Sequence, residues 1–253
     1  MNSRNISEMK IAAIIPARYQ STRFEGKPLA LIDGIPMIQR VYRQVEKSGR
    51  FDSQSIFVAT DDMRIASVVK DFGGNAVMTS PDHSSGSERL WEVVSNRDFD
   101  ALINIQGDEP VVPPRLISDI YDEMKQSRFD VVTPVFFNSS YEDYLSRNAV
   151  KVAINRELFA LYFSRSPIPY MDKKDFMGFY HHVGMYGYLK SVLNRFINFP
   201  KSQLETVEKL EQLRFLDNGI QIKTIITEYS SIGVDVPGDI ARVEEFIKKN
   251  KDN

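Results

Sequence analysis

The sequence predicts an α/β fold in which a mostly parallel sheet is covered by helices. Short apolar runs typical of buried strands alternate with stretches whose apolar residues recur at helical spacing, and Gly or Pro marks many of the boundaries. With 253 residues and 42% hydrophobic content, the chain can bury a full core. Repeated βα units favour parallel strands, because each helix returns the chain to the same end of the sheet.

The first βα unit is the clearest. Residues 11–15 are a β-type apolar run, and residues 36–48 predict a helix that begins at a proline and carries Met37, Val41 and Val45 on one face. Gly49 ends this helix. The same alternation predicts a strand at 55–59, a helix at 62–72, a strand at 76–79, a helix at 88–95 and a strand at 101–105.

The regular alternation continues through a helix that starts at Pro113-Pro114 and a strand at 131–137, and it weakens after about residue 140. Strand-like runs at 150–154 and 158–163, with a short turn between them, predict a hairpin insertion. Helices are expected at 204–216 and 239–249, on either side of a strand at 220–226. Without a repeat or a linker, we expect one domain over residues 1–253, with 1–10 as a flexible N-terminus.

Composition excludes several classes of protein. The formal net charge of −2 provides no global basic field for nucleic acid or anionic membranes. The absence of cysteine removes disulfides and thiolate chemistry and fits a reducing compartment. No segment has the apolar length of a signal peptide or a membrane span. We therefore expect a cytoplasmic protein that has no nucleic-acid partner and no membrane insertion.

A basic loop follows the first strand directly. Arg18, Arg23 and Lys27 lie within ten residues of one another, and Gly26 allows close approach of the backbone to a ligand. Ligands of α/β sheets bind at the carboxyl ends of the strands, so these cations predict an anion site, most economically for a polyphosphate. A solvated surface loop that happens to be basic is the alternative.

Two acidic residues are candidates for a metal site. Asp108 follows the strand at 101–105, at the same sheet edge as the basic loop, and can hold Mg²⁺ against phosphate oxygens. An ordinary turn at Gly107-Asp108 is the alternative. Asp235 precedes a helix that starts at a proline, and local sequence favours a helix N-cap there. Its interpretation as a second metal ligand depends on pairing with Asp108.

Polar residues in the second half of the chain are candidates for substrate contacts. Arg165 can bind a carboxylate through two hydrogen bonds, and His182, Glu211 and Gln212 can bind hydroxyl groups. Each also has a simple structural interpretation: a surface ion pair for Arg165, a partly buried imidazole for His182 and a solvated helix face for the other two.

The order of nine motifs resembles that of the 3-deoxy-manno-octulosonate cytidylyltransferases, also called CMP-Kdo synthetases. The resemblance extends from about Ile11 to the last helix. The motifs are Ile14-Ile-Pro-Ala-Arg-Tyr-Gln-Ser-Thr-Arg-Phe-Glu-Gly-Lys-Pro28, Ala59-Thr-Asp61, Asp82-His-Ser-Ser-Gly-Ser-Glu-Arg89, Asn104-Ile-Gln-Gly-Asp-Glu-Pro110, Asn148-Ala-Val-Lys-Val152, Ala160-Leu-Tyr-Phe-Ser-Arg165, His182-Val-Gly-Met-Tyr-Gly-Tyr188, Leu210-Glu-Gln-Leu-Arg214 and Gly233-Val-Asp-Val-Pro237.

This resemblance implies a reaction of CTP with the sugar acid Kdo that gives CMP-Kdo and pyrophosphate, the activation step before Kdo enters lipopolysaccharide. It implies a nucleotidyltransferase-type α/β/α sandwich with a Rossmann-like sheet, and a homodimer. A small hairpin-containing insertion at about 140–200 would take part in sugar binding and dimerisation.

The resemblance also implies a role for each matching residue. Arg18, Lys27, Asp108 and Asp235 would be the catalytic group, and both aspartates would bind Mg²⁺. The remaining roles fall into two sets. The nucleotide would contact Arg18, Ser21, Arg23, Lys27, Ser85, Gly86, Arg89 and Gln106, and the sugar acid would contact Arg165, His182, Tyr186, Glu211 and Gln212.

The chain departs from the family pattern at three places. Glu25 stands where the family usually has Pro, and we expect its side chain to point outward. Ser87 stands where Thr is usual, which keeps the hydroxyl. The segment 235–239 lacks the hydroxyl and carboxylate neighbours usual after the last strand. An amino-substituted substrate, 8-amino-Kdo, stays open, as do a metal-dependent glycosyltransferase and a non-catalytic nucleotide-binding module.

Overall fold

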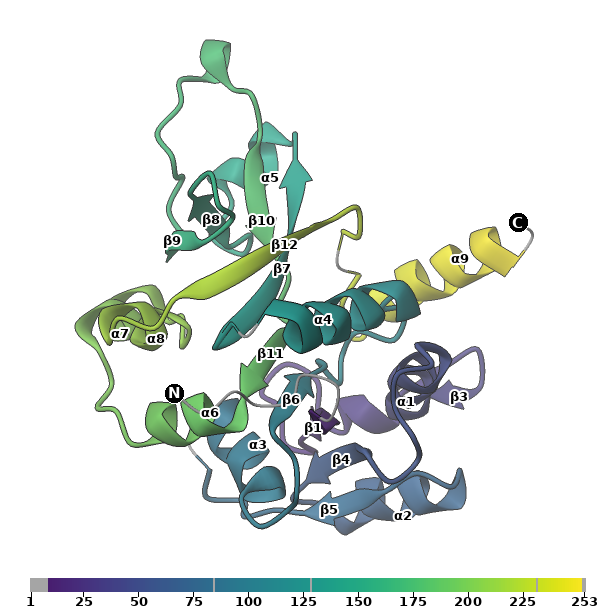
Figure 1. Cartoon of the computed structure of the whole chain (residues 1–253). Helices are drawn as coiled ribbons and strands as arrows, with labels where there is room; N and C mark the ends of the chain where they lie inside the picture. Colours follow the sequence, from purple (N-terminus) through teal and green to yellow (C-terminus); the bar gives the residue numbers. More distant parts are fainter. Residues whose placement is uncertain (1–8, 84, 128, 231, 252–253) are drawn as a thin grey trace.

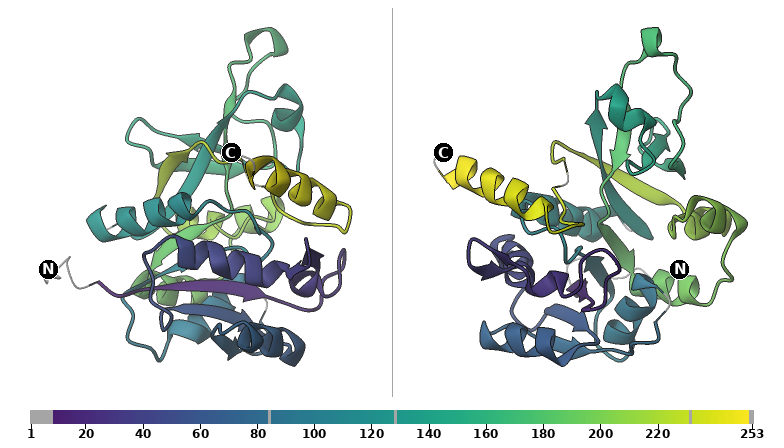
Figure 2. Two further views of the ribbon diagram at one scale, coloured as in Figure 1. Left: turned by 90° about the vertical axis from the view of Figure 1, so that its right-hand side faces the viewer. Right: turned by 180° about the vertical axis from the view of Figure 1, so that it is seen from behind.

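The computed structural model describes residues 9–83, 85–127, 129–230 and 232–251. A layered body holds the first half of the chain, and a narrower part protrudes above it (Figures 1 and 2). Of the N-terminus expected to be flexible, residues 1–8 lie outside this description. No helix in these ranges is both long and apolar enough to cross a bilayer.

The body is built on four parallel strands in the order β5-β4-β1-β6. They are β1 (Ile11–Ala17), β4 (Ile56–Thr60), β5 (Ala76–Met78) and β6 (Ala101–Asn104). The helices that connect and cover them are α1 (Met37–Lys47), α2 (Met63–Asp71), α3 (Gly86–Val94) and α4 (Pro114–Ser127). The βα units predicted from the sequence are confirmed, with boundaries that differ by one or two residues.

The sheet separates two hydrophobic cores, because successive side chains of a strand point to opposite faces. On β1, Ile11, Ala13 and Ile15 pack with α1, α2 and α4, whereas Ala12 and Ile14 pack with α3 on the other face. Figure 1 shows α3 and α1 on opposite sides of these strands. Burial on both faces explains why β1 is a continuous apolar run, and it confirms the α/β/α sandwich.

Beyond β6 the direction of the strands changes. β11 (Tyr186–Leu189) lies between β6 and β7 (Val131–Asn138) and is antiparallel to both. The protruding strands continue the antiparallel pairing, whereas β12 pairs with β7 in parallel. The expectation of a mostly parallel sheet therefore holds for the body, and the complete sheet is mixed. The other strands are β8 (Lys151–Ile154), β9 (Ala160–Ser164), β10 (Phe179–His182) and β12 (Ile222–Thr227).

The predicted β8–β9 hairpin is confirmed, with antiparallel pairing of Val152 and Phe163. Several short elements were not predicted from the sequence, because each is too short to show a clear period in its apolar residues. They are a hairpin of β2 (Leu31–Ile32) and β3 (Ile35–Pro36), α5 (Tyr141–Leu145), β10, β11, α6 (Lys190–Ile197), and the 3-10 turns η2 (Lys27–Leu29) and η3 (Lys173–Asp175).

The single helix predicted at 204–216 is wrong. The structure has α7 (Gln203–Glu208) and α8 (Leu213–Asp217), separated by a turn at which Lys209 adopts a φ of 55°. A left-handed residue ends an α-helix, and a non-glycine residue in this conformation is not signalled by the local sequence. The last helix, α9 (Asp239–Lys251), begins where it was predicted.

Candidate active site

The basic loop after β1 is anchored to helix α2 through Tyr19. The Gly26 N–H donates to the Tyr19 carbonyl at 2.8 Å, and a Cβ added to Gly26 would lie 3.2 Å from the Tyr19 ring. Gly26 also has a φ of 68°. Both this left-handed backbone conformation and the nearby Tyr19 ring therefore favour glycine at this position. The Arg64 guanidinium lies 3.3 Å from the centroid of the same ring. Glu25 is exposed, as expected for a carboxylate kept away from an anion site.

The loop lines a hollow of about 400 Å³ at the carboxyl end of β1. The residues predicted to bind the triphosphate, Arg18, Ser21, Arg23 and Lys27, all line it, together with Gln106 and Asp108. The structure therefore brings together three cations, a hydroxyl and an acidic residue around one space.

Lys27 joins the two candidate metal ligands. Its Nζ donates to Asp108 Oδ2 at 2.7 Å and to the Val234 carbonyl at 3.0 Å, and it lies 3.9 Å from Asp235 Oδ1. Arg23 Nη1 donates to Asp235 Oδ2 at 2.9 Å. Two carboxylates that are 127 positions apart in the chain thus face one cation, and the same two groups could hold a metal ion.

Asp235 is not the N-cap of the last helix. It lies four residues before α9, and its carboxylate pairs with Arg23. The carboxylate of Asp239 accepts the N–H groups of Asp235 and Val236 at 2.8 and 3.1 Å, and these bonds hold the pKa of Asp239 below its usual value. Asp239 therefore accepts the backbone hydrogen bonds that precede α9, and the carboxylate of Asp235 faces the site.

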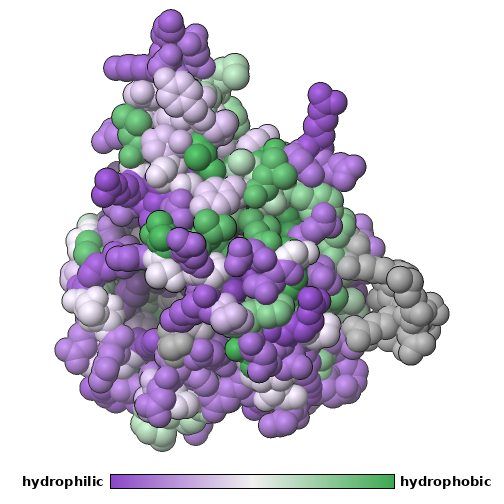
Figure 3. Space-filling view, turned by 90° about the vertical axis from the view of Figure 1, so that its left-hand side faces the viewer, coloured by the Kyte–Doolittle hydropathy of each residue, from purple (hydrophilic) through white to green (hydrophobic). Residues whose placement is uncertain are grey.

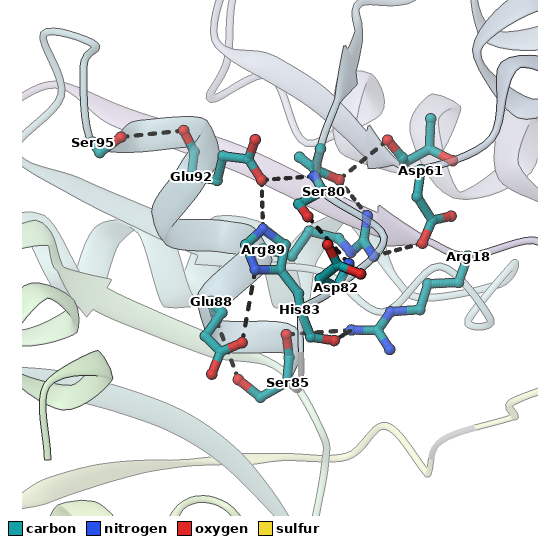
Figure 4. Close-up of polar contacts among 12 residues, drawn as sticks. Arg18, Asp61, Ser80, Asp82, His83, Ser85, Glu88, Arg89, Glu92 and Ser95 are labelled. Carbon is teal, nitrogen blue, oxygen red and sulfur yellow. Dashed lines mark hydrogen bonds and ion pairs between the residues drawn. The ribbon is translucent and has the colours of Figure 1, made fainter. Parts of the chain in front are cut away.

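Arg18 connects the basic loop to the start of helix α3. Its Nη2 donates to the carbonyls of His83 and Ser85 at 3.1 and 3.4 Å (Figure 4). Ser85 also caps α3, because its hydroxyl accepts the Glu88 N–H at 3.3 Å. The predicted nucleotide residues Arg18, Ser85 and Gly86 consequently lie beside one another.

Arg89, a predicted nucleotide residue, has its side chain in the protein interior. It is fully buried, its Nη2 donates to Asp61 Oδ2 at 2.7 Å and its Nη1 to the Thr79 hydroxyl (Figure 4). Burial lowers its pKa, an effect that Asp61 opposes. Arg89 lines neither the basic hollow nor the two hollows that adjoin it. From the interior it supports the loop that precedes α3, through its hydrogen bond to the Thr79 hydroxyl.

A second hollow, of about 350 Å³, adjoins the first at Pro16 and Gln106. It lies between the end of β6, the β10–β11 junction and the α7–α8 turn. Gln106 is fixed at its edge, because its Nε2 donates to the Gly184 carbonyl at 2.7 Å. Four of the predicted sugar residues line it: His182, Tyr186, Glu211 and Gln212. Gly86, a predicted nucleotide residue, lines it as well.

The walls of the second hollow combine apolar residues, such as Leu210 and Phe215, with polar side chains that are mostly uncharged. Burial lowers the pKa of His182 to about 3, so its ring is neutral near pH 7, and its Nε2 lies 3.0 Å from the Thr133 hydroxyl. Burial also raises the pKa of the Glu211 carboxyl, an effect that the nearby Ser85 and Ser87 hydroxyls oppose. Such a surface is suited to hydroxyl groups.

A buried ion pair positions Glu211 and Gln212. Arg214 of α8 donates from Nε and Nη2 to the two carboxylate oxygens of Glu205 in α7, at 2.7 and 2.5 Å. Glu205 also completes a capping box with Ser202. This pair holds the two short helices on either side of the turn that follows Lys209.

Arg165 is the predicted sugar residue that lines none of the hollows described around the site. Its Nε donates to the Glu208 carbonyl and its Nη1 to the Arg147 carbonyl, each at 3.0 Å. Its backbone N–H donates to the Glu208 carboxylate at 2.9 Å. Arg165 is thus held at the C-terminal end of α7.

A third hollow, of about 470 Å³, lies on the other side of Asp108 and Asp235 and includes Asp143 and His181. Sequence reasoning missed these two residues, and nothing in their local sequence distinguishes them. It also missed Asn104, which lines the second hollow. For Asn104 a signal existed: it is a polar residue at the end of an apolar strand, two residues before Gln106.

The chain is similar to known proteins over nearly its full length. The family model described as Cytidylyltransferase matches residues 12–225. A 3-deoxy-manno-octulosonate cytidylyltransferase of Geotalea uraniireducens is 46% identical, over 95% of this chain and 100% of its own. A second 3-deoxy-manno-octulosonate cytidylyltransferase, of Thermodesulfovibrio yellowstonii, is 43% identical, over 94% of this chain and 98% of its own.

Solved structures show the same fold. A CMP:2-keto-3-deoxy-manno-octonic acid synthetase complexed with CTP has a TM-score of 0.90 and 39% identity, covering 95% of this chain and 99% of its own. A 4-diphosphocytidyl-2C-methyl-D-erythritol synthase from Anaerococcus prevotii, at 15% identity and a TM-score of 0.62, shares the fold alone. The full-length identity and the matching motifs establish that this chain belongs to the 3-deoxy-manno-octulosonate cytidylyltransferase (CMP-Kdo synthetase) family.

Proposed function

We propose that this protein transfers CMP from CTP to Kdo and releases pyrophosphate. The observation that carries the proposal is the junction of two hollows at Gln106, one lined by Arg18, Arg23 and Lys27, the other polar and nearly uncharged. The first suits a triphosphate and the second a polyhydroxylated sugar. Their shared edge would bring the two reactants together, and such positioning supplies much of the rate in phosphoryl-type transfer.

The nucleotide would occupy the basic hollow. Arg18, Ser21, Arg23 and Lys27 would bind the phosphates, and Ser85, Gly86 and Gln106 would contact the nucleoside. Lys27 would move from the aspartates to phosphate oxygens, where it offsets the repulsion between two anionic substrates. Arg89, which is buried, would act by supporting the loop before α3.

Asp108 and Asp235 would hold Mg²⁺. Both carboxylates lie within 4 Å of the same Lys27 ammonium, so their oxygens already face a common cation position. No group of three or more acidic or imidazole side chains suited to a metal occurs among the residues placed in the structure. Two carboxylates fit Mg²⁺, which takes its other ligands from water and substrate phosphates. When bound, the ion neutralises phosphate charge.

The sugar acid would occupy the polar hollow, where His182, Tyr186, Glu211 and Gln212 would bind its hydroxyls. Its anomeric hydroxyl would attack the α-phosphorus in line with the departing pyrophosphate, without a covalent enzyme intermediate. Arg165 would bind the carboxylate. Because Arg165 does not line the polar hollow, its guanidinium would have to leave the Glu208 and Arg147 carbonyls to reach this anion.

A pyrophosphate-release assay tests the proposal. The enzyme is incubated with CTP, Mg²⁺ and one of three acceptors: Kdo, 8-amino-Kdo or sialic acid, a nonulosonate. We expect release with Kdo and little with sialic acid; a higher kcat/KM with 8-amino-Kdo would reassign the acceptor. Turnover of a preformed CMP-sugar instead would support a glycosyltransferase. Binding of CTP without turnover of any acceptor would support a regulatory module.

We also propose a homodimer formed through the insertion at about 140–200. Large apolar side chains are exposed there, including Leu161 (61%), Tyr170 (83%) and Met177 (80%). Figure 3, which shows the face that carries β9 and α7, displays hydrophobic atoms below a hydrophilic tip. Leu161→Glu should convert a dimer to a monomer in light scattering. Met63→Glu, a comparable change on α2, should leave the dimer intact.

We propose a cytoplasmic location and a role before lipopolysaccharide assembly, since CTP is a cytoplasmic metabolite. Fractionation of cells with an antibody against the protein tests the location. Recovery in the membrane fraction after a salt wash would contradict it.

A further inference from the structure

Asn104 ends strand β6 with its side chain in the polar hollow. The residue is 8% exposed, and its Oδ1 is buried without a hydrogen-bond partner among the residues the structure describes. Asn104 lines the hollow together with Gln106, two residues further along the chain. The proposed function assigns no contact to Asn104.

Tyr186 lies directly opposite Asn104 in the antiparallel pairing of β6 and β11. Residues at opposite positions of such a pair carry their side chains on the same face. Tyr186 is 7% exposed, and its hydroxyl is also buried without a partner in the described part of the chain. A third buried oxygen without a partner there, Glu211 Oε1, comes from the α7–α8 turn. All three residues line the same hollow.

Buried polar atoms in native proteins are nearly always hydrogen-bonded, so an unpaired one requires an explanation. Three of them from separate elements around one hollow point to a ligand that supplies the missing bonds. An amide oxygen and a carboxylate oxygen are acceptors, and a tyrosine hydroxyl can donate or accept. The matching ligand therefore presents several hydroxyl donors close together.

We infer that Asn104 is a substrate-contacting residue that accepts a hydrogen bond from a hydroxyl of the sugar acid, beside Tyr186 and facing Glu211. This inference rests on the proposed function and deepens it, because it assigns a specificity-determining residue to the sugar pocket. A site built to bind a hydroxyl rejects an analogue that lacks it, because the site's own polar groups are then left unpaired.

The hydroxyls of the CTP ribose share this chemistry, so the two sources have to be separated. The hollow favours the sugar acid, because its walls include His182, Glu211 and Gln212, none of which borders the basic hollow. Gln106 borders both hollows and is the residue expected at the ribose.

The test compares Asn104→Leu, which keeps the approximate size, and Asn104→Ser, which keeps a short acceptor, with the wild type. Initial rates of pyrophosphate release give KM for Kdo at saturating CTP and KM for CTP at saturating Kdo. We expect Asn104→Leu to raise KM for Kdo about tenfold, with a smaller rise for Asn104→Ser. KM for CTP should change by less than about twofold, and the melting temperature should not fall, since removal of an unpaired buried group does not destabilise.

Asn75→Leu is the matched control. The Asn75 amide donates to the Ile56 carbonyl at 3.1 Å and to the Ser53 carbonyl, far from the hollow. This variant should melt at a lower temperature, because two carbonyls lose a donor, and it should keep both KM values.

Mono-deoxy analogues of Kdo complete the experiment. For at least one of them, wild-type kcat/KM should fall about tenfold or more, and in Asn104→Leu the penalty for that analogue should shrink to about threefold or less. A raised KM for CTP with an unchanged KM for Kdo would reassign Asn104 to the nucleoside. Lower stability with both KM values unchanged would make the residue structural. Either result leaves the proposed function standing, because that depends on wild-type turnover of Kdo.

Discussion

The Lys27 ammonium lies 2.7 Å from Asp108 Oδ2 and 3.9 Å from Asp235 Oδ1, so one cation faces both acidic residues of the site. This contact joins the loop after β1 to the end of β6 and to the segment before α9. Lys27 thereby lies between the two candidate metal ligands and the hollow that would hold the phosphates.

Asp108→Asn should lower kcat by about 10²–10³-fold while leaving the fold intact, because an amide keeps the shape and removes the charge that would hold Mg²⁺. Pyrophosphate release and circular dichroism measure the two effects. Asp119→Asn, an exposed change on α4, serves as the control and should retain full activity. Near-normal turnover of Asp108→Asn would exclude the assigned metal role.

Arg214→Met should lower the free energy of unfolding by about 3–5 kcal/mol, because it leaves the Glu205 carboxylate buried without its partner. It should also raise KM for Kdo, since the α7–α8 turn carries Glu211 and Gln212. Urea denaturation and initial rates measure both.

The double variant Glu205→Leu with Arg214→Met should recover much of the lost stability. Arg115→Met, at a side chain that is 92% exposed, is the matched control and should change stability by less than about 0.5 kcal/mol. A loss in Arg214→Met no larger than in this control would mean that the pair does not hold the helices together.

His182 should make the protein sensitive to acid. Burial lowers its pKa to about 3 from a usual 6.5, so folding favours the neutral ring. The resulting stability is complete above pH 6.5 and is lost as the pH falls from 6.5 toward 3, by about 1.4 kcal/mol for each pH unit.

Denaturant unfolding of the wild type and of His182→Gln at pH 7.5, 5.5 and 4.5 tests this dependence. The stability advantage of the wild type, whatever its size at pH 7.5, should shrink as the pH falls, because glutamine does not titrate. Parallel stability curves for the two proteins would show that His182 does not titrate as a buried group.

Lys209→Gly should raise the free energy of unfolding by about 0.5–1 kcal/mol. Glycine adopts the φ of 55° found at this position without a clash of Cβ, and that relief exceeds its greater loss of backbone entropy. Lys248→Gly, inside helix α9, should instead destabilise by up to about 1 kcal/mol. Equal losses at both positions would show that the left-handed turn at 209 carries no strain.

The elements that could be predicted share a physical property: their patterns are local. The strand β1 is apolar throughout because both of its faces are buried, and the apolar residues of α1 recur at helical spacing because one side of the helix is buried. Short strands such as β10 and β11 have no such signature, since their direction depends on which neighbours they find. The break at Lys209 depends on the Glu205–Arg214 pair, which forms only when both helices are packed.

For the site, the sequence by itself determined the chemistry: a basic loop at a strand end, two aspartates at the carboxyl edge, and motifs whose order identifies the family. Tertiary structure alone decided which residues meet. It placed Arg23 against Asp235, 212 positions away, and buried the side chain of Arg89. It also placed Asn104 in the wall of the second hollow, which Arg165 does not line. Contacts of this kind depend on strand order and on the burial of each side chain, and neither is encoded in the spacing of residues along the chain.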